Sequence, residues 1–260
     1  MQPWKRFFIL GPAVLLGVSL ASTAYGGPPF LTDDPEPVDY QHWEFYVASM
    51  HTQTGSDWAG TAPHFEVNYG VLPDVQLHMI APLAYDAPAS GSSHYGYGDT
   101  ELGIKLRFLQ ETNYLPQAGI FPLVEVPSGS SSDNLGAGHW QVFLPVWLQK
   151  SWGSWTAYGG GGYWINSFNN DRNSGFVGGV LQKQITKNVL LGAEVYHETA
   201  TEDEPANTAF NIGTVIDLSE SHHLMFSAGR SIVGPVNFQC YIAYQFTFDN
   251  SLFHFWHHSQ

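Results

Sequence analysis

The residues best suited to chemistry in this 260-residue sequence are charged side chains placed at every second position of short segments. In residues 99–109, Glu101, Lys105 and Arg107 alternate with apolar residues. A β-strand projects residues i, i+2 and i+4 to one face, so these three side chains should share a face. Opposed acids and bases lining a pore would create a transverse field that sorts solutes by size and dipole. The pattern therefore predicts solute selection or ion pairing.

Ten residues with the same inward parity are the candidate lining of a solute pathway. They are Glu44, His64, Glu66, His78, Glu101, Lys105, Arg107, Glu125, Glu194 and Glu198. Six carboxylates against two bases would favour cations or neutral polar solutes over anions. The alternative is that the charges pair across the interior, for example Glu101 or Glu125 with Lys105 or Arg107, because unpaired buried charges are costly. Phe121, Phe143 and Trp147 share this parity and either accept an amphipathic solute or fill space.

No arrangement of residues for catalysis accompanies these charges. The sequence has neither a Gly-x-Ser-x-Gly elbow nor a His-Glu-x-x-His metal pair. Its single cysteine, Cys240, excludes an intramolecular disulfide and a cysteine-based zinc cluster. The histidine-rich segment 253–258 has metal-ligand chemistry, but a disordered tail or a plug contact is the preferred interpretation. We therefore predict no enzyme activity, no cofactor and no metal site.

Composition narrows the class of protein. Nine Lys and Arg stand against 23 Asp and Glu, for a net charge of −14, which argues against a nucleic-acid partner. Charged residues make up only 12% of the chain, whereas aromatic residues reach 15%. Such a composition predicts a chain of many β-strands whose surface contacts a medium other than water.

The N-terminal region predicts export followed by an extended arm. Lys5 and Arg6 precede an apolar stretch over residues 7–20 and small residues near 22–26, so residues 1–26 are interpreted as a signal peptide. Residues 27–41 hold four prolines and several acids, which predicts an extended arm.

From residue 42 onward the apolar residues repeat with period two, which predicts strands and no helix. Twelve strands are expected, at 42–53, 60–71, 74–86, 98–109, 116–127, 139–150, 154–165, 174–185, 188–199, 207–218, 222–231 and 237–248. An even strand number, alternating short turns and long polar loops, and aromatics near strand ends are typical of an outer-membrane barrel. We therefore predict an all-β, 12-stranded antiparallel transmembrane barrel over residues 42–248 with a tail at 249–260.

The competing interpretation is a soluble β-sandwich or periplasmic barrel, in which the apolar face would point inward. Pro82, Pro122 and Pro145 count against uninterrupted strands, because each removes a ladder hydrogen bond unless a bulge absorbs it.

The sequence also resembles a known family along nearly the whole mature chain. The similar stretches are residues 28–37 (PPFLTDDPEP), 42–46 (HWEFY), 62–64 (APH), 67–70 (VNYG), 98–103 (GDTELG), 121–125 (FPLVE), 149–153 (QKSWG), 158–163 (YGGGGY), 227–230 (SAGR) and 234–235 (GP). They resemble the outer-membrane transporters grouped as the MetA-pathway-of-phenol-degradation family. One departure is that 12 residues follow Phe248, where such barrels usually end on an aromatic residue.

The resemblance implies an outer-membrane barrel that transports small, aromatic or hydrophobic solutes. Its expected partners are outer-membrane lipid, the barrel assembly machinery and a small-molecule solute, with no nucleic acid. A structural barrel with a closed lumen and a barrel hydrolase remain the alternatives. The number of strands does not decide whether the lumen is open, because eight-stranded barrels are filled, those of about sixteen strands hold a channel, and twelve lies between.

Overall fold

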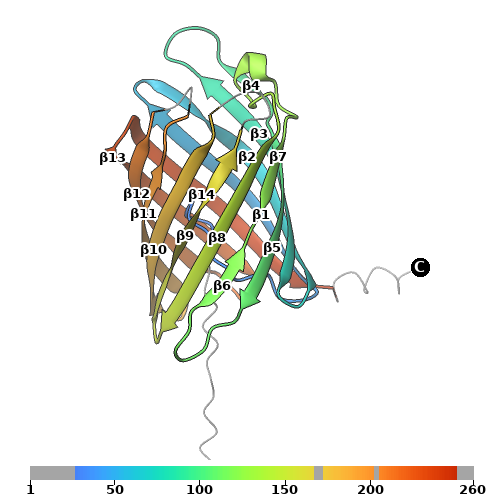
Figure 1. Cartoon of the computed structure of the whole chain (residues 1–260). Coiled ribbons are helices and arrows are strands. Elements are labelled where there is room, and N and C mark those ends of the chain that lie inside the picture. Colours follow the sequence, from blue (N-terminus) through green and yellow to red (C-terminus); the bar gives the residue numbers. More distant parts are fainter. Residues whose placement is uncertain (1–26, 167–171, 202–204, 251–260) are drawn as a thin grey trace, which may run out of the picture.

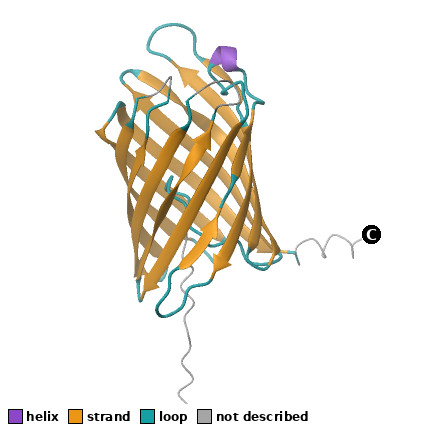
Figure 2. Ribbon diagram, in the orientation of Figure 1, coloured by secondary structure: helices purple, strands orange, loops and turns teal. Residues whose placement is uncertain are grey.

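The chain forms a closed antiparallel β-barrel with twelve positions in its wall, which confirms the predicted fold class (Figures 1 and 2). The computed structural model describes residues 27–166, 172–201 and 205–250. The predicted signal peptide and residues 251–260 of the predicted tail therefore lie outside the described residues. The barrel closes where β1 (His42–Thr54) pairs with β14 (Val236–Asp249).

Fourteen strand segments occupy these twelve positions. The other segments are β2 (Asp57–Leu72), β3 (Val75–Ala87), β4 (His94–Tyr97), β5 (Thr100–Leu109), β6 (Gln117–Ile120), β7 (Leu123–Val126), β8 (Gln141–Trp152), β9 (Trp155–Ile165), β10 (Ser174–Thr186), β11 (Val189–Glu198), β12 (Asn207–Asp217) and β13 (His222–Val233). Strands β4 and β5 both pair with β3, while β6 and β7 both lie between β5 and β8. Each of these pairs is one wall position with a break in it.

Proline explains one of the two breaks in the wall and one of its register shifts. Pro122 separates β6 from β7, and its carbonyl still accepts a hydrogen bond from the Ile104 amide at 3.2 Å. Pro82 lies opposite His64, where the β2–β3 register shifts. A bulge or a break lets the wall continue although proline donates no hydrogen bond.

The two ends of the barrel differ, though less regularly than the sequence suggested. The sequence predicts a longer loop at residues 55–59, but the structure has a tight two-residue turn there, at Gly55–Ser56. The connection at Gly234–Pro235, at the same end of the barrel, is equally short. The connection between β5 and β6 at the opposite end, residues 110–116, is longer than its neighbours. Among the described residues, no helix is long and apolar enough to span a membrane.

The outward face of the wall is apolar and the inward face is polar. Ile104 is 50% exposed on the outside, whereas the adjacent Lys105 is 5% exposed inside. This arrangement is the reverse of a soluble sandwich and suits a barrel whose outer surface meets lipid. At the barrel end where β1 begins, Trp43 stacks on Tyr69 at 4.2 Å, and Phe246 stacks on Phe248 at 5.1 Å. Stacked aromatics at a rim are typical of an interfacial girdle.

Candidate functional site

The N-terminal arm, residues 27–41, lies inside the barrel and occupies part of its lumen (Figure 1, blue). Phe30 is buried with Tyr158 of β9 and Val180 of β10. The backbone amide of Thr32 donates to Glu194 at 2.5 Å, and Ser227 donates to the carbonyl of Pro29 at 2.5 Å. The arm therefore contacts strands far from it in the sequence and narrows the passage.

Five inward-facing glycines, which we name the glycine track, make room for the arm. They are Gly70, Gly119, Gly178, Gly192 and Gly213. A Cβ at Gly192 or Gly213 would lie 2.8 or 3.0 Å from the Phe30 ring, and one at Gly178 would overlap Thr32 Oγ1. The wall is thus shaped to hold this segment closely, as glycine is used where another backbone approaches a strand.

Charged groups on β5 hold the acidic part of the arm. Lys105 Nζ lies 2.9 Å from Asp33 and 3.7 Å from Asp34. Arg107 lies 3.6 Å from Glu36 and 2.7 Å from Asp74. These ion pairs differ from the Glu101 and Glu125 pairings that the sequence suggested, because the arm brings its own carboxylates into the lumen.

Amide side chains complete the binding of the arm. Gln117 and Gln149 both donate to Glu36, at 3.1 and 3.0 Å, and Gln76 accepts from the Val38 amide at 2.8 Å. Asp34 is 1% exposed, and burial raises its pKa to about 7 although Lys105 lowers it. The docked arm therefore carries a carboxyl group that takes up a proton near neutral pH.

Beside the arm, the lumen contains a cavity of about 820 Å³. Eleven carboxylate side chains and one lysine, Lys105, are among its described lining residues. Its interior should therefore have a negative potential, which low-dielectric walls would focus.

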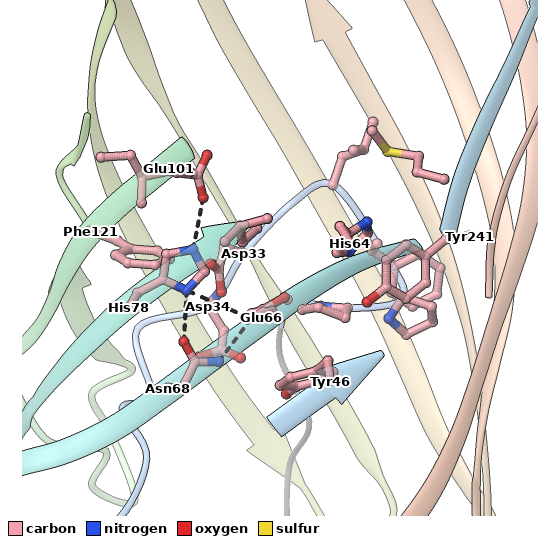
Figure 3. A pocket seen from close by; sticks show the side chains of 18 of the residues that line it. Asp33, Asp34, Tyr46, His64, Glu66, Asn68, His78, Glu101, Phe121 and Tyr241 are labelled. Carbon is pink, nitrogen blue, oxygen red and sulfur yellow. Dashed lines mark hydrogen bonds and ion pairs between the residues drawn. The ribbon is translucent and has the colours of Figure 1, made fainter. Parts of the chain in front are cut away.

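A chain of hydrogen bonds crosses one side of this cavity (Figure 3). His78 Nε2 lies 2.8 Å from Glu101, and its Nδ1 lies 2.7 Å from Asn68 Oδ1. The amide of Asn68 in turn donates to Glu66 at 2.8 Å. The Glu101 carboxylate and the Asn68 side-chain oxygen both accept hydrogen bonds, so each imidazole nitrogen of His78 faces an acceptor.

Aromatic side chains continue the wall from Phe121 round to β11. Phe121, Phe143, Trp147, Phe176 and Tyr196 form one buried cluster, against which Leu123 and Trp164 pack. Phe143 stacks on Trp164 at 4.7 Å, and Phe176 stacks on Tyr196 at 5.8 Å. Gly160 and Gly162 allow this packing, because a Cβ there would lie 2.9 Å from the Trp147 ring or 2.6 Å from that of Phe143.

The structure divides the predicted pathway residues into two groups. Eight line the cavity: Glu44, His64, Glu66, His78, Glu101, Lys105, Glu125 and Glu198. Arg107 and Glu194 instead bind the arm. Sequence reasoning missed Asp33, Asp34 and Glu36 as lumen residues, although the few basic residues of the barrel signalled where an acidic segment would bind.

The chain has a closed barrel, a polar lumen and an apolar outer face. This is the architecture of outer-membrane channels and porins. An outer membrane channel from Pseudomonas putida F1 superimposes with a TM-score of 0.69 and 16% identity, over 83% of this chain and 98% of that chain. A KdgM porin in complex with disordered oligogalacturonate gives a TM-score of 0.56 and 8% identity, over 78% and 99%. At such identities the likeness concerns the fold. No family model and no curated protein matches the sequence.

Proposed function

We propose that the protein is an outer-membrane channel for small solutes and that the N-terminal arm closes its lumen. The observation that carries this proposal is a cavity of about 820 Å³ inside a 12-stranded barrel, bordered by the docked arm. A barrel with a solvent-accessible interior and an apolar outer face is suited to carry solutes across a lipid layer.

The mixed lining indicates the kind of solute. Aromatic residues such as Phe121 and Phe143 lie beside carboxylates such as Glu101 and Glu125, so an amphipathic molecule finds partners for both of its parts. The resemblance to the phenol-degradation family also supports small, aromatic or hydrophobic solutes. Outer-membrane lipid and the barrel assembly machinery are the partners that this location requires.

Planar-bilayer conductance tests the proposal. The mature full-length protein should give small or rare conductance steps, and a variant lacking residues 28–38 should give larger discrete steps. Both proteins should fractionate with the outer membrane and show heat-modifiable migration. A folded, arm-deleted barrel that stays silent would instead favour a structural barrel with a closed lumen.

A further inference from the structure

The cavity beside the arm combines two chemical surfaces that meet on adjoining strands. Glu66, Glu101 and Glu125 contribute carboxylates from β2, β5 and β7. Leu123, on the same face of β7 as Glu125, packs against the aromatic cluster that includes Phe143. A ligand at Glu125 would therefore lie next to aromatic rings.

One pair of carboxylates in this wall is poorly compensated. Glu101 and Glu125 are direct partners on the antiparallel strands β5 and β7. Like charges directly opposite each other in a sheet are destabilising. His78 contacts Glu101, whereas no described side chain gives the Glu125 carboxylate a hydrogen bond or an ion pair. A cation entering the cavity would offset this repulsion.

The lumen already holds one ammonium group, that of Lys105, between a carboxylate and an aromatic ring. The Nζ of Lys105 lies 2.9 Å from a carboxylate oxygen of Asp33 and 5.0 Å from the centroid of the Phe121 ring. A carboxylate together with an aromatic face is a favourable environment for an ammonium ion away from bulk water. Lys105 is occupied by the arm, so among the described residues Glu101 and Glu125 have no ammonium partner of their own.

We propose that this cavity binds organic cations in which a protonated amine is joined to an aromatic or other apolar group. The amine would lie at Glu101 and Glu125, and the apolar group would contact Phe121, Phe143 and Trp164. This inference rests on the proposed channel function, whose solute class it names. An organic anion of the same shape meets like charge throughout the cavity and is disfavoured.

Three probes of matched shape test the proposal on the unaltered full-length protein: phenethylamine, phenethyl alcohol and phenylacetate. Isothermal titration calorimetry in a non-ionic detergent should show the amine binding about tenfold more tightly than the alcohol, since a charge-assisted hydrogen bond contributes roughly that factor. Phenylacetate should not bind, and ethylamine, which lacks the ring, should bind more weakly than phenethylamine. Equal affinities for amine, alcohol and carboxylate would overturn the proposal without any variant.

The double variant Glu101→Gln, Glu125→Gln locates the site. Its affinity for phenethylamine should fall about tenfold or more, while its affinity for phenethyl alcohol stays the same. Glu111→Gln is the matched control, because Glu111 pairs with Lys150 outside the cavity. Unchanged amine binding in the folded double variant would overturn the assignment.

The channel function and the binding proposal fail in different ways. An arm-deleted barrel that conducts but does not distinguish the amine from the alcohol would remove the binding proposal alone. A barrel that binds the amine and never conducts would remove the channel function and keep the binding site.

Discussion

Phe30 is the aromatic anchor of the arm, and its ring lies against two glycines and the side chains of Tyr158 and Val180. Phe30→Ala should weaken docking, since removing a buried phenylalanine side chain costs about 3–5 kcal/mol in a well-packed core. The expected result is a higher open probability in planar bilayers and faster proteolysis of the arm. Leu31→Ala is the control, because Leu31 is 43% exposed. Equal effects of both substitutions would show that Phe30 does not anchor the arm.

Asp34 should make docking of the arm depend on pH. Its pKa is about 7 when docked, mainly because of burial, against an ordinary value of 3.8 when the arm is free. The docked form therefore holds its proton more tightly, so docking is favoured at low pH and weakens as the pH rises from about 4 to 7. Lys105, Asp33 and Glu36 are the charged groups near it.

Open probability should therefore be lower at pH 5 than at pH 8. Asp34→Asn should reduce this difference, because the amide does not titrate. A pH response of unchanged size in Asp34→Asn would assign it to another group.

At the scale of elements, β5 binds the arm through Lys105 and Arg107. Replacing both residues with Gln should remove the positive partners of the arm's carboxylates. Breaking the buried Lys105 pair should by itself cost about 3–5 kcal/mol. The variant should open more often than the parent in bilayers. Lys183→Gln is the control, because Lys183 lies over the Trp155 ring rather than against the arm.

The reversal potential under a salt gradient separates the roles of these two bases. A shift towards stronger cation preference would show that they also face the conducting path. A double variant whose opening and selectivity both match the parent would exclude them from binding the arm and from lining the path.

The close contact between the glycine track and the arm can be tested at Gly178 of β10. Gly178→Ala should displace the arm, because its Cβ would overlap Thr32 Oγ1 and Thr32 is fully buried. The neighbouring Gly179→Ala is a close control, since its Cβ would lie 4.0 Å from the nearest atom. Proteolysis of the arm should accelerate only in Gly178→Ala. Protection equal to the parent would mean that the track does not determine docking.

At the scale of the whole molecule, the two faces of the wall should respond differently to charge. Ile104→Arg should destabilise the barrel by about 2–4 kcal/mol in lipid, because Ile104 lies on the outer apolar face. Thr52→Arg places the same side chain in the cavity, which Thr52 lines, and should be tolerated better. Folding yield in lipid vesicles, read as heat-modifiable migration, measures both. Equal losses would contradict the assignment of the faces.

Much of the barrel follows from the sequence because a strand's faces are a local property. Alternation at every second residue predicts that Lys105 faces the lumen and that Ile104 faces outward, as the structure shows. The same rule predicts the twelve strand positions of the wall. The break at Pro122 also follows locally, since proline cannot donate to the ladder. Parity likewise placed Phe121, Phe143 and Trp147 on the inward face, where all three are buried.

The contents of the lumen required the tertiary structure. Lys105 and Asp33 are 72 residues apart in the sequence, and Thr32 and Glu194 are 162 apart, so no local pattern relates them. Which inward side chains meet depends on the closure of the barrel and on the segment that enters it. The sequence by itself thus determined the strands, their faces and an acidic arm, whereas the fold decided that this arm pairs with β5 and that Glu101 and Glu125 border the remaining cavity.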